Sequence, residues 1–269
     1  MRAGSIARWA GLSLGLAVLA LAIVAPGTLA SGDPLGVDPS SAFASPSAAH
    51  WFGTDESGRD VFTRVVHGAA SSAGIGLAAT ALGGGLGVLL GLAAGVGPHW
   101  LDAAISRVVE VLFALPTMVM ALLLIAVIGP GSTGAVIAIG LATAPGYARM
   151  FRARTRQVAR SGYVEYARLE GAGTGRVLIR HVLPNVFWPL VAVAALGIGQ
   201  AIVWVAALGF LGLGALPPDP EWGAMINAGR VYLATAWWIT FFPGLAIVAT
   251  AALLTAAGRT LARASKELP

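Results

Sequence analysis

Long runs without a charged side chain alternate with short polar segments along this chain. The uncharged runs cover residues 9–32, 68–101, 111–148, 186–209 and 231–258. A helix rises about 1.5 Å per residue, so roughly 20 apolar residues cross the ~30 Å core of a membrane. The run at 111–148 has room for two such helices, separated by a glycine-rich break at 129–134. The pattern therefore predicts an all-α, polytopic membrane protein with six transmembrane helices.

These runs divide the chain into three predicted parts. Residues 1–30 form an N-terminal transmembrane helix, residues 31–67 an extracytoplasmic loop with several prolines, and residues 68–269 a five-helix core. A cleaved signal peptide is the alternative for the first run, because Arg2 and Arg8 precede it and small residues follow near Ala30. The length of the run and the further spans favour a retained helix.

A stripe of glycines indicates a close helix contact in the second run. Gly83, Gly87, Gly91 and Gly95 recur every four residues and share one face of a helix. Small residues in this arrangement allow a second helix to approach closely. The alternative is chance in a chain with 36 glycines, but strict spacing over four steps favours a packing face.

The polar segment at 149–185 interrupts the core and cannot lie in hydrocarbon, where its charges would be unpaired. It holds eight of the 17 Lys and Arg residues, which predicts a cytoplasmic location. Four preceding spans then place the N-terminus in the cytoplasm, and the sixth span places the C-terminus there. The pattern indicates a short exposed helix that ends near Gly171. Leu183 precedes Pro184 and is biased away from the helical region, so the next helix is expected to begin at that proline.

Composition agrees with a membrane protein and restricts its chemistry. Apolar residues make up 57% of the chain, charged residues only 11%, and mean hydropathy is +0.80. The absence of cysteine excludes disulfides and thiolate metal sites. The basic pI near 10.4 reflects arginines placed by membrane topology rather than a nucleic-acid partner.

Three function classes compete: a subunit of an ATP-driven importer, an ATP-independent secondary transporter and a membrane enzyme. The chain cannot bind ATP through a Gly-Lys-Ser/Thr loop, because its one lysine is Lys266. A secondary transporter usually needs ionisable groups at membrane depth, and the uncharged runs contain essentially none. No catalytic cluster or metal-binding pattern is evident. The G-x-G-x-x-G match at 129–134 is read as a turn, because it lies between two membrane helices.

The polar segment resembles the EAA loop of bacterial ABC-importer permeases. The residues at the corresponding positions are Glu165, Tyr166, Ala167, Arg168, Gly171, His181, Leu183, Pro184 and Asn185. His181 and Asn185 match the dipeptide/oligopeptide/nickel branch. The resemblance implies a coupling helix that docks on a cytoplasmic ATPase. A catalytic or metal-binding role is the alternative for His181, and a loop hydrogen bond or an ATPase contact is expected instead.

Other segments resemble the C-type permease subunit of peptide importers. The extracytoplasmic loop carries the G-T-D-x-x-G-R-D pattern as Gly53, Thr54, Asp55, Gly58, Arg59 and Asp60. Residues 100–116, 208–230 and 241–244 match further family blocks, with Asp102, Arg107 and Glu110 marking a short cytoplasmic turn. Residues 208–230 are expected to cap the translocation path near the outer face.

The resemblance implies the type I ABC importer permease fold in the bacterial cytoplasmic membrane. The expected partners are a B-type permease subunit, two ABC ATPase subunits, an extracytoplasmic solute-binding protein and membrane lipid. ATP and Mg would bind to the ATPases, and no cofactor to this chain. The expected substrate is a short peptide, with nickel or a metal chelate as the alternative; no substrate-binding residue is predicted.

The chain departs from the family pattern at several positions. Tyr166 replaces the usual Ala, Val205 stands where the family often carries Glu, and Gly209 replaces Ser. These departures affect the expected ATPase partner and substrate, not the architecture.

Overall fold

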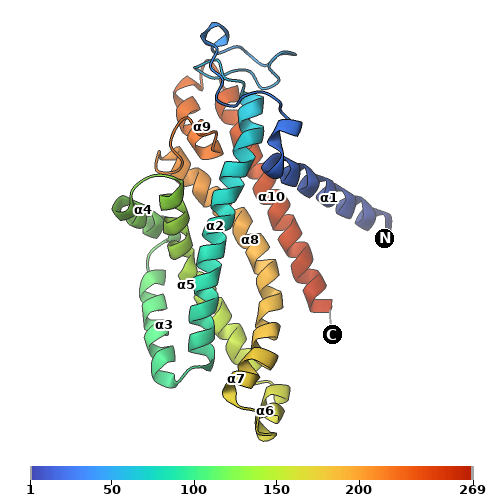
Figure 1. Ribbon diagram of the computed structural model, residues 1–269, viewed down its shortest axis with the longest axis vertical. Helices are drawn as coiled ribbons and strands as arrows, with labels where there is room; N and C mark the ends of the chain where they lie inside the picture. Colours follow the sequence, from blue (N-terminus) through green and yellow to red (C-terminus); the bar gives the residue numbers. More distant parts are fainter. Residues whose placement is uncertain (1, 268–269) are drawn as a thin grey trace.

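A computed structural model describes the backbone of residues 2–267 and the side chains of residues 9–167, 169–173, 175–186 and 193–262. Within these residues the secondary structure is helical, and the one β-type pairing is an isolated bridge between Thr54 and Asp60. The helices form an elongated bundle (Figure 1). We call the end that holds residues 25–60 and α9 the upper end, and the end that holds α6 and α7 the lower end. The predicted all-α fold is confirmed.

Seven longer helices make up the bundle over the described residues 2–267. They are α1 (Arg2–Val24), α2 (Val61–Val96), α3 (His99–Phe113), α4 (Thr117–Ile128), α5 (Ser132–Ala159), α8 (Leu183–Phe210) and α10 (Trp238–Glu267). The shorter elements are α6 (Gly162–Leu169), α7 (Thr174–Val177), a π-helical segment (Leu178–Val182), α9 (Trp222–Gly229) and 3₁₀ turns at Pro26–Thr28, Pro39–Ser41 and Arg230–Tyr232.

α2 and α5 are in extensive contact and form the centre of the bundle. All four glycines of the predicted stripe lie against α5. A Cβ atom added at Gly83 would lie 2.6 Å from the carbonyl oxygen of Gly140, and one at Gly91 would lie 2.5 Å from Cβ of Phe151. A Cβ at Gly87 or Gly95 would collide with Tyr147 or Thr155 in the same way. Normal carbon contacts are about 3.5–4.0 Å, so the two backbones meet too closely for any larger residue.

The predicted third span, which was expected to start at residue 111, is not one continuous helix. α3 and α4 are bent by 92° relative to each other, at the break between Phe113 and Thr117. Pro116 accounts for the break, because it has no N–H to donate and disfavours a helical Leu115. Asp102, Arg107 and Glu110 lie within α3, not in a turn as predicted; the turn precedes α3, at Gly97 and Pro98.

Among the described residues, three helices are long and apolar enough to cross a membrane, or four if the bent pair counts as one span. The six-span count stays a prediction. The first predicted span, residues 9–32, is too long: the apolar part of α1 is Trp9–Val24, and a 3₁₀ turn begins at Pro26. The upper loop also ends earlier than expected, because Asp60 caps α2 by accepting a 2.8 Å hydrogen bond from the N–H of Thr63.

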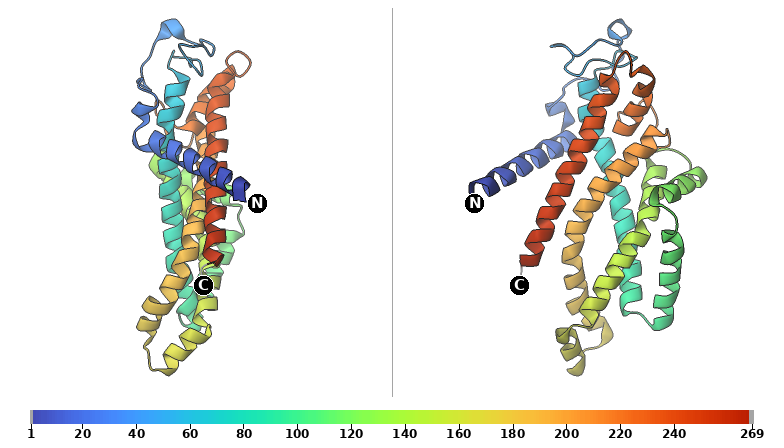
Figure 2. Two further views of the ribbon diagram at one scale, coloured as in Figure 1. Left: turned by 90° about the vertical axis from the view of Figure 1, so that its right-hand side faces the viewer. Right: turned by 180° about the vertical axis from the view of Figure 1, so that it is seen from behind.

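The remaining helices pack around the α2–α5 pair. α8 contacts both α2 and α10, and α9 lies against α8 and α10 at the upper end (Figures 1 and 2). α1 contacts α2 and α10, then runs away from the bundle (Figure 2). The chain thus presents an upper loop region and a lower α6 region at opposite ends of one bundle.

Candidate functional site

α6, the predicted coupling helix, is fixed to the lower end of the bundle by one buried face. Val164 has no exposed surface (0%), and Ala167 is also buried. The apolar cluster that holds Val164 also contains Phe151, Val158, Val177, Val182 and Val186. Because these residues come from α5, α7, the π-helical segment and α8, the position of α6 follows the ends of the long helices.

The opposite side of α6 carries exposed, largely apolar side chains. Tyr163, Tyr166 and Leu169 are all exposed, the last two by 63% and 83%. We call these three residues the α6 face; Glu165 and Glu170 are exposed beside it. The side chain of Arg168 lies outside the described residues. Exposed apolar groups gathered on a short helix are typical of a surface that another protein covers.

Gly171 ends α6 in a conformation that favours glycine. Its φ is +82°, in the left-handed region. The N–H of Ala172 donates to the carbonyl oxygen of Ala167 at 3.0 Å, the six-to-one hydrogen bond of a Schellman motif. Nothing lies within 4 Å of a Cβ added at Gly171, so the constraint is on the backbone and not on space.

The prediction that the chain leaves the helical region at Leu183 was wrong. Leu183 has φ −57° and ψ −47°, and helical structure continues from Thr174 to Phe210. The π-helical segment Leu178–Val182 immediately precedes Pro184, and the N–H of Leu183 donates to the carbonyl oxygen of Leu178, five residues back. A proline ring normally collides with the carbonyl four residues earlier, and the wider π turn relieves this collision.

His181 lies in the π-helical segment and connects it to α6. Its ring centroid is 6.3 Å from that of Tyr163, and the Asn185 side-chain amide donates a 2.7 Å hydrogen bond to the His181 carbonyl oxygen. The role of the His181 side chain stays a prediction.

An ion-pair cluster braces the lower ends of α3 and α5. The Asp102 carboxylate accepts hydrogen bonds from Arg152 Nε at 2.5 Å and Arg152 Nη2 at 3.1 Å, and it also accepts one from Arg156. Asp102 itself is buried. One carboxylate thus holds two arginines of α5, close to the point where α6 begins.

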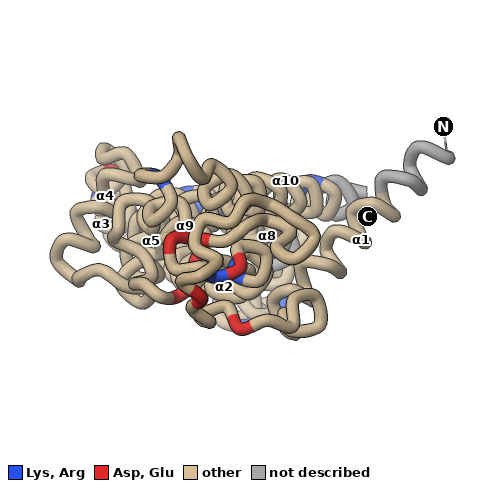
Figure 3. The backbone as a smooth tube through the Cα atoms, turned by 90° about the horizontal axis from the view of Figure 1, so that it is seen from above, with Lys and Arg blue, Asp and Glu red and all other residues tan. Residues whose placement is uncertain are grey.

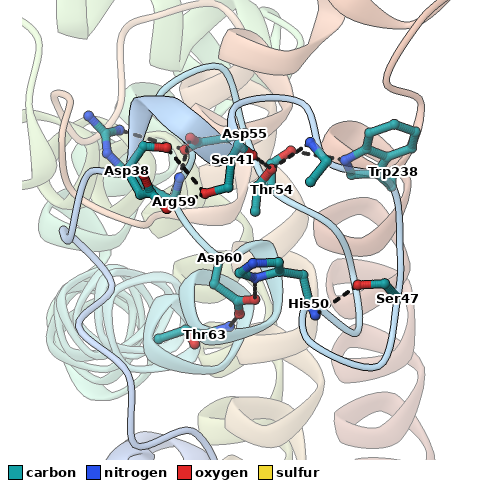
Figure 4. Close-up of polar contacts among 11 residues, drawn as sticks. Asp38, Ser41, Ser47, His50, Thr54, Asp55, Arg59, Asp60, Thr63 and Trp238 are labelled. Carbon is teal, nitrogen blue, oxygen red and sulfur yellow. Dashed lines mark hydrogen bonds and ion pairs between the residues drawn. The ribbon is translucent and has the colours of Figure 1, made fainter.

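The upper loop residues of the G-T-D-x-x-G-R-D pattern form a connected network (Figure 4). Asp55 Oδ1 accepts the N–H groups of Ser57 and Arg59 at 2.9 Å each, and Oδ2 lies 3.6 Å from Arg64 Nε on α2. The Thr54 carbonyl oxygen accepts a 3.0 Å hydrogen bond from Trp238 Nε1 on α10. These bonds tie the loop to the upper ends of α2 and α10.

The other members of the pattern shape and end the loop. Asp60 Oδ2 lies 3.0 Å from His50 Nδ1, while its other oxygen caps α2. A Cβ at Gly53 would lie 2.6 Å from Trp238 Nε1, and one at Gly58 would collide with the Asp38 carbonyl oxygen. The pattern therefore specifies the fold of the loop.

Glu221 is a buried carboxylate that the sequence analysis did not single out. It caps α9 by accepting the N–H groups of Gly223 and Ala224 at 2.8 Å each, and it accepts a 3.3 Å hydrogen bond from Ser72 Oγ on α2. Burial raises the pKa of the Glu221 carboxyl, and these hydrogen bonds act in the opposite direction. Its position directly before an eight-residue helix was the available signal.

Acidic residues gather at this upper end. Residues 33–60 and 219–221 contain seven of the 12 acidic residues of the chain. Figure 3, viewed from above, shows several of them over α2 and α9. The upper end is thus acidic, whereas the arginine-rich segment lies at the lower end.

The structure shows what surrounds two of the residues that depart from the family pattern, Val205 and Gly209. Val205 has no exposed surface and lies in an apolar cluster with Ile139 and Leu208, so a carboxylate there would be buried. Gly209 lies directly against Glu221 and against the backbone of α9. The Gly209 contact leaves no space for the usual serine without a shift of α9.

Comparisons with known proteins agree with this architecture. The family model described as "Binding-protein-dependent transport system inner membrane component" matches residues 87–266. A dipeptide transport system permease protein, DppC, of Alkalihalophilus pseudofirmus is 39% identical over 88% of this chain and 78% of its own length. A probable D,D-dipeptide transport system permease protein, DdpC, of Escherichia coli is 42% identical over 83% of this chain and 75% of its own length.

Solved structures show the same fold at low sequence identity. An amino acid ABC transporter aligns with a TM-score of 0.61 and 14% identity, over 75% of this chain and 94% of that chain. An inward-facing form of the MetNI methionine ABC transporter aligns with a TM-score of 0.54 and 20% identity, over 71% of this chain and 92% of that chain. The chain therefore belongs to the family of inner membrane components of binding-protein-dependent transport systems, as a permease similar to the dipeptide permease DppC.

Proposed function

We propose that this chain forms half of the translocation path of an ATP-driven importer of short peptides. The observation that carries the proposal is similarity along most of the chain to permeases named for peptides. A third such relative, the glutathione transport system permease protein GsiD of Pectobacterium atrosepticum, is 40% identical over 76% of this chain. Dipeptide, D,D-dipeptide and glutathione all contain peptide-type amide bonds, which favours a peptide over nickel as the cargo.

The α6 face receives force from a separate motor in this proposal. Each of two ATPase subunits binds ATP and Mg, and one of them covers Tyr163, Tyr166 and Leu169. A second, B-type permease subunit completes the path, and a solute-binding protein docks at the acidic upper end. This arrangement places the lower end and both termini in the cytoplasm, in agreement with the arginine content of residues 149–185.

The first experiment is co-purification of the tagged chain, followed by peptide uptake into proteoliposomes. ATPase subunits and a second permease are expected to co-purify, and uptake of a labelled dipeptide is expected to need ATP and the binding protein. Uptake by this chain alone, driven by an ion gradient without nucleotide, would refute the proposal.

The second experiment tests α6. Glu165→Arg and Gly171→Asp are expected to abolish uptake while membrane insertion persists, because one reverses a charge beside the α6 face and the other strains the Schellman turn. Glu110→Arg is the matched control, since it makes the same charge change on an exposed side chain of α3. Normal uptake with Glu165→Arg and Gly171→Asp would remove the coupling role from α6.

A further inference from the structure

A groove with both polar and apolar lining residues runs between α8 and α10, which lie side by side in Figure 2. Its volume is about 670 Å³, within the ~300–1,000 Å³ range of small-molecule sites. The two helices meet at its base, where a Cβ at Gly199 would lie 3.1 Å from the Ala251 carbonyl oxygen, and the small residues Ala252 and Ala256 continue the α10 wall. The groove belongs to neither the α6 face nor the upper loop network.

Polar side chains line this groove in the middle of α8 and near the lower end of α10, where Arg259 directly follows the uncharged run 231–258. Gln200 comes from the span Val193–Phe210, and Thr255 and Arg259 come from the span Trp238–Ala262. Gln200 and Arg259 are exposed, and no described residue forms a hydrogen bond or ion pair with the Gln200 amide or the Arg259 guanidinium. In hydrocarbon these groups would be unpaired, and polar side chains within spans generally face water or a protein partner.

The chemistry of these groups suits a peptide. The Gln200 amide offers a donor and an acceptor, as the peptide group does, and Arg259 matches a terminal carboxylate. The groups are few, which suits a path that has to bind a solute weakly enough to release it.

We infer that the groove is this subunit's wall of the translocation path, with Gln200, Thr255 and Arg259 in contact with water and with the passing peptide. The inference rests on the proposed function and adds the path-lining residues to it. The occupant is a short peptide in water; lipid and a helix of the second permease are the alternatives that the experiment separates.

The test uses the absence of cysteine in this chain. Gln200→Cys and Arg259→Cys are introduced singly into the assembled transporter in proteoliposomes. A charged, membrane-impermeant methanethiosulfonate is added, and its attachment to this chain is read by mass spectrometry. Both variants are expected to react, and excess dipeptide is expected to slow the reaction at Gln200→Cys. Leu14→Cys on α1 is the control, because that side chain is 67% exposed among apolar neighbours and is expected to stay unmodified in lipid.

The results that would overturn the inference differ from the result that would overturn the proposed function. An unreactive Gln200→Cys in an assembled transporter overturns the inference, as does cross-linking of that cysteine to the second permease, or modification that excess dipeptide does not slow. A second measurement covers function: Gln200→Leu is expected to reduce dipeptide uptake and Gln200→Asn to retain it, and equal uptake by both contradicts the inference. If the wild-type transporter takes up no peptide with ATP, the proposed function fails instead.

Discussion

The glycine contact between α2 and α5 gives the sharpest test of the fold. In Gly91→Ala the added Cβ would lie 2.5 Å from Phe151 Cβ, 2.8 Å from the Arg152 nitrogen and 2.9 Å from the Ala148 oxygen. Restoring a normal carbon contact of about 3.5–4.0 Å requires the helices to separate by roughly 1 Å. Overpacking of this kind typically costs about 1–3 kcal/mol, whereas alanine in a helix is favoured over glycine by roughly 0.5–1 kcal/mol. The expected net effect is a loss of stability of up to about 2.5 kcal/mol.

Gly85→Ala provides the matched control on the same helix, because nothing lies within 4 Å of its added Cβ. It has the same gain in helix propensity without the collision. Thermal unfolding of the purified chain in one detergent, followed by size-exclusion chromatography after heating, measures both variants. Gly91→Ala is expected to unfold below the wild type, and Gly85→Ala at or above it. Equal unfolding temperatures for the two variants would contradict the close contact of α2 with α5.

Three further predictions concern the polar braces and the upper loop. Asp102→Asn leaves Arg152 and Arg156 without their shared carboxylate, and is expected to lower the free energy of unfolding by about 1–2 kcal/mol. This is less than the ~3–5 kcal/mol for breaking a fully buried pair, because both arginines are partly exposed. The control Glu110→Gln, which removes an exposed ion pair, should change the unfolding temperature little. Gly58→Ala combines a φ of +75° with a collision at the Asp38 carbonyl, so limited proteolysis should cut residues 31–60 faster than in the wild type. For Glu221, a raised pKa contributes stability that is full below the ordinary carboxyl pKa and is lost as pH rises through the raised value. Glu221→Gln should therefore weaken the decline in unfolding temperature as pH rises above the ordinary carboxyl pKa of about 4, and an unchanged decline would argue against a raised pKa.

Local patterns in the sequence predicted much of the architecture. Uncharged runs predicted the all-α membrane fold, and glycines at 129–134 predicted a break where α4 ends and α5 begins. Four-residue spacing indicated a glycine contact surface on α2, although nothing in the sequence identified Phe151 or Tyr147 as the residues it meets. Such partners depend on the crossing of two helices, which periodicity within one helix does not determine.

The incorrect predictions involved prolines and a charged residue whose ion-pair partners are remote in sequence. Pro116 breaks a span that hydropathy alone describes as continuous, whereas Pro184 is tolerated because a π turn precedes it. Asp102 was read as a turn residue, since its partners Arg152 and Arg156 are far along the chain. Glu221 is different: its cap on α9 is local and could have been predicted, whereas its contact with Ser72 on α2 is remote in sequence.

The glycine contact also has a mechanical consequence. Because the backbones of α2 and α5 interlock along residues 83–95, neither helix can slide past the other without a collision. α5 leads directly into α6 at one extremity, and α2 starts from the Asp60 cap at the other. Under the proposed function, a displacement of α6 by an ATPase is therefore expected to move α5 and α2 together and to reach the Asp55 network at the upper end.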